Sequence, residues 1–147
     1  MPNITSQRFG APQFTPGDGC AAFMIDRAVV SSNFSAGETI RFSLPAGIEW
    51  GMVEIQCDDL DSNATPTIAF SVGYAPTQLE TIYTAAPTYF SGTGQTTMRT
   101  GGRLICSFPP IKFEEDMALV LTIGTAAATF AAGSVWAICC GAARGLA

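Results

Sequence analysis

Residues 36–74 read AGETIRFSLPAGIEWGMVEIQCDDLDSNATPTIAFSVGY, and this stretch decides the fold. Three short runs in it place apolar residues at every second position, which puts them on one face of an extended chain. The apolar positions are Ile40, Phe42 and Leu44 in the first run, Val53, Ile55 and Cys57 in the second, and Ile68, Phe70 and Val72 in the third. Such alternation is typical of antiparallel sheets with one buried and one exposed face.

The same pattern continues along the chain, with Gly- and Pro-containing turns between the runs. The sequence predicts strands over residues 22–30, 38–44, 50–58, 67–74, 103–108, 117–123 and 134–140. Strands of this length with regular turn signals indicate an all-β protein, an antiparallel β-sandwich or a jelly roll.

Two segments depart from this pattern. Residues 1–19 are rich in proline and glycine, which disfavour helices and long strands, so we expect an extended N-terminal arm followed by a single sandwich domain over 20–147. Phe9 and Phe14 lie in this segment and favour an arm that docks on a neighbour, the alternative being a disordered tail.

The second departure is an insertion around residues 77–100. Leu79, Ile82 and Tyr83 have helical spacing, which predicts a short helix over 77–85 or an irregular insertion. Thr77 with Glu80 three residues later resembles a capping box at the start of such a helix. We expect the small polar residues 91–97 to form a loop.

The composition indicates contacts with other chains. Hydrophobic residues make up 48% of the 147 residues and charged residues only 13%, against about 25% charged in typical soluble domains. A single sandwich of this size cannot easily bury so much apolar surface, and the excess is typical of a subunit interface. We therefore expect an obligate oligomer or a component of a larger assembly.

The charge balance argues against two classes of partner. The net charge is −5, and Lys112 is the only lysine, so no basic stripe is available for nucleic acid. No apolar run reaches the roughly 18 residues of a membrane span, and the first residues do not resemble a secretory signal. The five cysteines, Cys20, Cys57, Cys106, Cys139 and Cys140, are interpreted as buried thiols, with disulfides as the alternative.

Motifs for catalysis are absent from the sequence. The chain has no histidine, which rules out Ser-His-Asp and Cys-His arrangements and removes the commonest metal ligand. We predict a protein that is not an enzyme and has no catalytic, cofactor-binding or metal-binding residues.

Two acidic clusters are the candidates that compete with this prediction. Asp58, Asp59 and Asp61, with Asn63, are interpreted as a turn whose side chains bond to backbone amides, with a calcium site as the alternative. The run 114–116, Glu-Glu-Asp, could supply a glycosidase pair but is more typical of a solvated turn.

Aromatic residues supply the remaining candidates for recognition. Most of these residues are interpreted as members of the core or of an interface. A carbohydrate-binding face would need their side chains exposed. The candidate interaction residues are Phe9, Phe14, Trp50, Tyr83 and Tyr89.

Three segments carry a resemblance to a known family. Residues 34–47 (FSAGETIRFSLPAG), 58–74 (DDLDSNATPTIAFSVGY) and 121–135 (LTIGTAAATFAAGSV) resemble capsid decoration, or cement, proteins of tailed bacteriophages. The resemblance implies a β-sandwich or jelly roll on the outer capsid surface, often a homotrimer, that bridges major capsid subunits. It also implies synthesis in the cytoplasm of the host bacterium and a final location in the virion.

Three other functions stay open at the sequence level. One is a structural component of the phage tail or head fibre. Another is a carbohydrate-binding sandwich module, which would need an exposed Trp50 or Tyr83. The last is an enzyme, for which no residue spacing brings an acid pair together.

Overall fold

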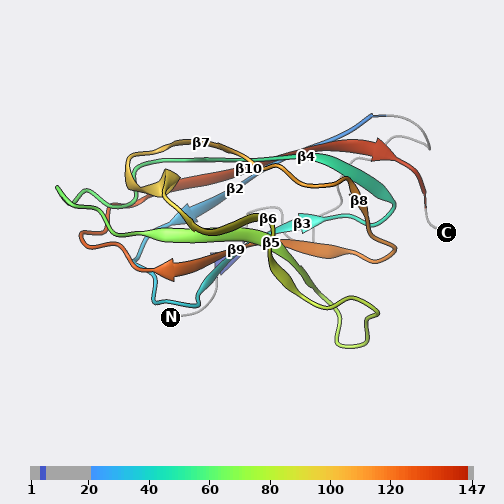
Figure 1. The fold of residues 1–147 in the computed structure, drawn as a ribbon, viewed down its shortest axis with the longest axis horizontal. Helices are drawn as coiled ribbons and strands as arrows, with labels where there is room; N and C mark the ends of the chain where they lie inside the picture. Colours follow the sequence, from blue (N-terminus) through green and yellow to red (C-terminus); the bar gives the residue numbers. More distant parts are fainter. Residues whose placement is uncertain (1–3, 6–20, 146–147) are drawn as a thin grey trace.

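Two β-sheets packed face to face form the molecule (Figure 1). The computed structural model describes residues 4–5 and 21–145. The strands are β1 (Ile4–Thr5), β2 (Ala21–Val30), β3 (Thr39–Leu44), β4 (Ile48–Cys57), β5 (Ala69–Pro76), β6 (Ala86–Gln95), β7 (Gly102–Ile105), β8 (Ile111–Lys112), β9 (Met117–Thr125) and β10 (Gly133–Ala143). A single 3₁₀ turn, η1 (Thr97–Arg99), is the helical element of the described residues.

The strand order is that of a jelly roll. One sheet runs β1-β3-β9-β5-β6 and the other runs β2-β10-β4-β7, with the short β8 paired to β4. The eight longer strands thus form two four-stranded sheets, and all their pairings are antiparallel. Among the described strands, only β1 pairs in parallel, with β3. The predicted all-β sandwich of jelly-roll type is confirmed.

The alternating runs of residues 36–74 bury the faces that the sequence predicts. Every apolar position of the three runs is at most 5% exposed, and these side chains fill the space between the sheets. Strand β9 departs from simple alternation, because Ala118 and Val120 are buried as well as Met117, Leu119 and Leu121. It lies in the middle of its sheet, between β3 and β5, so side chains of both neighbouring strands flank its outward residues.

The predicted helix over 77–85 is wrong, and an irregular segment takes its place. The threonine hydroxyls of this segment form hydrogen bonds with the distant turn at residues 115–116. The Thr77 hydroxyl donates to the carbonyl oxygen of Asp116 at 2.9 Å, and the Thr81 hydroxyl donates to Glu115 at 2.6 Å. These long-range bonds override the local spacing of apolar residues.

The predicted loop over 91–97 is largely a strand. Strand β6 pairs with β5 through two register shifts, and its glycines and polar residues conceal the alternation that normally marks a strand. It is the edge strand of its sheet, where exposed polar residues are common. The other two strands that sequence reasoning missed, β1 and β8, have two residues each.

Most of the predicted N-terminal arm, including Phe9 and Phe14, lies outside the described residues, as does Cys20. Its described part, Ile4–Thr5, pairs in parallel with Ile40 and Arg41 of β3. The division between an arm over 1–19 and a domain over 20–147 stays a prediction.

One glycine allows β6 to approach β5. A Cβ atom on Gly73 would overlap the backbone of Ala86 and Pro87. We expect Gly73→Ala to destabilise the fold by at least about 1–3 kcal/mol, because backbone atoms cannot rotate away as a side chain can. Urea denaturation followed by tryptophan fluorescence measures this change.

Gly92→Ala is the matched control. Gly92 is exposed on β6, and a Cβ atom there meets nothing within 4 Å. We expect a change within about 0.5 kcal/mol. Equal stability of the two variants would contradict the close approach at Gly73.

Candidate interaction surface

Strand β2 is mostly apolar on both of its faces, with Asp26 and Arg27 as its only charged residues. Ala22, Met24, Ala28 and Val30 are buried in the core. On the opposite side, Phe23 is 58% exposed, and Ile25 and Val29 are each 46% exposed. A strand at the edge of a sandwich that faces water normally carries polar residues on its outer side, so these side chains are candidates for contact with another chain.

The strand register extends this surface across the whole β2-β10-β4-β7 sheet. Phe23 lies opposite Cys140 and Ile25 opposite Ile138, and those residues lie opposite Met52 and Glu54 of β4. Directly opposed side chains in a sheet are in contact range. We call the set the outer apolar face: Phe23, Ile25, Val29, Met52, Ile105, Trp136, Ile138 and Cys140.

An ion pair sits within the outer apolar face. The Nε atom of Arg103 lies 2.7 Å from Oε1 of Glu54, whose side chain is only 10% exposed, whereas Arg103 is 61% exposed. Another chain could cover this face without leaving the Glu54 carboxylate as an uncompensated buried charge. Arg27, opposite Trp136, adds one positive charge.

Sequence reasoning missed this face, although a signal for it was present. Residues 21–30 read AAFMIDRAVV, with apolar residues at both odd and even positions. A strand with apolar residues on both sides and only Asp26 and Arg27 as charged residues indicates burial of both faces in the complete assembly.

The predicted interaction residues occupy different environments. Trp50 is 1% exposed and lies in the core, so its side chain is not accessible to another molecule in this structure. Tyr83 and Tyr89 are partly exposed members of an aromatic cluster. The interaction roles of these two tyrosines, and of Phe9 and Phe14, stay predictions.

Edge-to-face contacts hold the aromatic cluster together. The ring centroids of Tyr74 and Phe113 are 4.8 Å apart, and those of Tyr83 and Phe113 are 5.3 Å apart. The Tyr89 hydroxyl donates to the carbonyl of Pro109 at 3.0 Å. Both tyrosines are therefore engaged within the chain, which does not favour a flat aromatic platform for a sugar.

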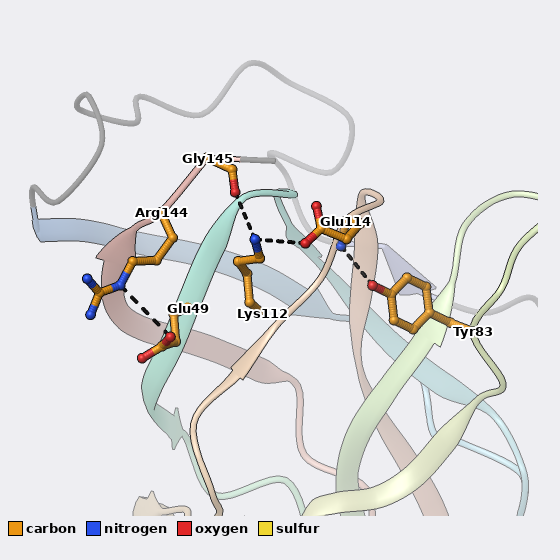
Figure 2. Close-up of polar contacts among 6 residues, drawn as sticks. All are labelled: Glu49, Tyr83, Lys112, Glu114, Arg144 and Gly145. Atoms are coloured by element: carbon orange, nitrogen blue, oxygen red, sulfur yellow. Dashed lines mark hydrogen bonds and ion pairs between the residues drawn. The ribbon is translucent and has the colours of Figure 1, made fainter. Parts of the chain in front are cut away.

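The acidic run 114–116 fixes loops. Figure 2 shows the Glu114 amide donating to the Tyr83 hydroxyl at 2.8 Å, and Lys112 paired with the Glu114 carboxylate at 2.7 Å. Lys112 also donates to the carbonyl of Gly145 at 3.1 Å (Figure 2). Asp116 accepts from the Ala46 amide at 2.8 Å. These contacts give the acids a positioning role.

The Asp61 carboxylate is the acceptor at which two distant loops meet. It is 1% exposed and accepts from the amides of Thr67 at 2.7 Å, Ile68 at 3.1 Å, and Ala128 and Thr129 at 2.9 Å. Burial raises the pKa of this carboxyl group, but the four backbone hydrogen bonds outweigh burial and hold the pKa well below its usual range.

The neighbouring Asp and Asn side chains also accept hydrogen bonds from backbone amides. Asp59 accepts from the Asp61 amide, Asp58 from the Ser134 amide and Asn63 from the Thr65 amide. The predicted turn with side chains bonded to backbone amides is confirmed. Residues 4–5 and 21–145 contain no cluster of three or more His, Cys, Asp or Glu side chains that could hold a metal ion.

The described cysteines are free thiols. Cys57, Cys106 and Cys139 are buried and Cys140 is partly exposed. Burial raises the pKa of Cys57 to about 12 and that of Cys106 to about 11, so both stay protonated at neutral pH. The interpretation as buried small hydrophobes is confirmed for the first three.

Comparison with solved structures finds the same fold in two bacteriophage capsids. A chain from the capsid of Ralstonia phage GP4 superimposes with a TM-score of 0.77 and 21% identity, over 97% of this chain and 98% of that chain. A chain from the capsid asymmetric unit of cyanophage Pam1 gives a TM-score of 0.71 and 24% identity, over 90% and 93%. At this identity the similarity establishes a shared fold over nearly the whole chain.

At the level of sequence, no protein-family model and no curated protein matches the chain. In the described part of the chain, no helix has the length and apolar character needed to cross a membrane.

The Asp61 site predicts a pH dependence of stability. Its folded-state pKa lies below the ordinary value of 3.8, so the site stabilises the fold fully above about pH 4, and this contribution is lost as the pH falls further. We expect thermal denaturation from about pH 5 to pH 2 to show a smaller loss of melting temperature in Asp61→Asn than in the parent protein. At pH 7 the variant should melt lower, because its amide group faces backbone donors.

Glu80→Gln is the matched control, since it removes one negative charge from an exposed side chain. We expect it to melt like the parent protein at pH 7 and to keep the same acid dependence. An Asp61→Asn variant that also behaved like the parent protein would rule out the carboxylate as the acceptor that joins the two loops.

Proposed function

We propose that this protein is a structural virion protein of a tailed bacteriophage, a decoration or cement protein on the outer surface of the head. The observation that carries the proposal is the nearly full-length similarity to chains of two phage capsid structures. In this role the protein bridges neighbouring major capsid subunits after synthesis in the host bacterial cytoplasm.

The outer apolar face supports a protein that works in contact with other chains. Four of its side chains, Phe23, Ile25, Val29 and Ile105, are 46–69% exposed in the isolated chain. We assign this face to contacts between copies, as a homotrimer. Its charges are few and nearly balanced, with Glu54 paired to Arg103, so identical copies meet little like-charge repulsion there.

The mechanism of stabilisation is mechanical and requires no reaction. Each trimer carries several identical shell-binding sites, and binding at one site raises the effective concentration of the others. Modest contacts thereby become a strong clamp between capsid subunits.

We expect the purified protein to co-sediment with expanded phage heads that lack it and not with isolated tails. Heads treated with the protein should also withstand higher temperature before releasing DNA, as measured by dye accessibility. Binding to tails alone would favour the tail or fibre alternative and contradict the proposal.

The homotrimer is tested separately in solution. We expect light scattering to give three times the chain mass, and Phe23→Ser with Ile105→Ser to weaken association by about tenfold or more, because each copy buries less apolar surface. Both side chains lie outside the core, so the fold should stay intact by circular dichroism.

Thr93→Ser is the control for that double variant, because Thr93 is exposed on β6, in the other sheet. It should associate like the parent protein. A parent protein that is monomeric at micromolar concentration would contradict the assignment of the outer apolar face to contacts between copies.

A further inference from the structure

The segment 77–85 connects β5 to β6 and projects away from both sheets, as the yellow-green loop at the lower right of Figure 1. Two of its aliphatic side chains are the most exposed large apolar groups of the described residues: Leu79 is 104% exposed and Ile82 is 81% exposed. Their exposure leaves them without contacts in their own chain that would explain an apolar residue there.

The base of this loop is fixed. Thr77 and Thr81 bond to Asp116 and Glu115 as described above, and the amide of Ile82 donates to Glu115 at 3.4 Å. The Tyr83 ring packs edge-to-face on Phe113. Since the residues on both sides of Leu79 and the amide of Ile82 are held, less conformational entropy is lost when a partner binds these side chains.

The surroundings of the two aliphatic side chains are acidic. Glu80 and Asp116 are exposed, and Glu115 is partly exposed. Residues 77–85 and 114–116 contain no Lys or Arg, and the adjacent Lys112 is paired with Glu114. Two such loops meeting each other would repel, whereas a surface with basic groups would attract them.

We propose that the loop 77–85 is the contact of this protein with the capsid shell, and that Leu79 and Ile82 enter an apolar pocket rimmed by Lys or Arg side chains of a shell subunit. This inference rests on the proposed function. Two aliphatic side chains are too small a surface for a stable complex alone, for which about 800 Å² per partner is usual. A shell offers the pocket many times in a fixed lattice, so an oligomer can engage several pockets at once.

The test combines Leu79→Ser and Ile82→Ser and measures two quantities. Binding to purified heads that lack the protein is expected to fall on the order of 100-fold, because every loop of the oligomer loses its anchor. The oligomeric state by light scattering and the melting temperature are expected to stay unchanged, because both side chains lie outside the core.

Two further variants sharpen the measurement. Thr84→Ser introduces the same residue type at an exposed position of the same loop and should bind heads like the parent protein. Glu80→Lys should weaken head binding, and the loss should be greatest at low salt, because a charge opposite the basic rim has been reversed.

The outcomes separate the two proposals. Unchanged head binding by the Leu79→Ser, Ile82→Ser protein, while the parent protein binds, overturns the assignment of the loop and leaves the proposed function standing. Loss of the oligomer in that variant also overturns it, because the loop would then contact another copy. A parent protein that does not bind heads overturns the proposed function, and this inference with it.

Discussion

Each strand of a two-sheet sandwich turns one face towards the other sheet and one face outward, and this constraint governs the molecule. The core takes the inward residues of both sheets, including the alternating apolar positions of residues 36–74. Most outward residues of β2 and β10 are apolar as well, and Phe23, Ile25 and Val29 stay 46–58% exposed. Much of the apolar excess in the composition therefore lies in the outer apolar face, and Leu79 and Ile82 of the loop 77–85 form a second exposed apolar site.

Backbone hydrogen bonding to Asp61 solves a different problem, the closure of one end of the sandwich. The residues that follow β4 and those that follow β9 are irregular, so their amides lack sheet partners. The buried carboxylate of Asp61 accepts hydrogen bonds from amides of both segments. One of these amides belongs to Ala128, which is 67 residues away in the sequence. In the sequence, this cluster of acidic residues resembles a calcium-binding loop. In the structure, backbone amides donate to the carboxylate oxygens of Asp61, and these are the oxygens that a calcium ion would need as ligands.

The sequence predicted those features that depend on local alternation, and missed those that depend on distant contacts. Seven strands and the buried positions of three runs followed from period-two patterning. The false helix over 77–85 had good local signals, but Glu115 and Asp116 compete for its threonines across more than 30 residues. Local reasoning also placed Trp50 among the contact residues, whereas packing between the sheets buries it. The outer apolar face could have been inferred from the missing polar side of residues 21–30.

The two apolar surfaces differ in shape and charge, and this difference bears on the proposed role. The outer apolar face is a broad sheet surface in which Glu54 is paired with Arg103 and Arg27 adds one positive charge, so copies meet little like-charge repulsion on it. The loop 77–85 is narrow, projecting and acidic, which disfavours contact between like loops and favours a partner of opposite charge. A clamp needs both kinds of surface: one that joins copies and one that grips the shell. Because separate sheets and loops carry them, one surface can be altered without altering the other.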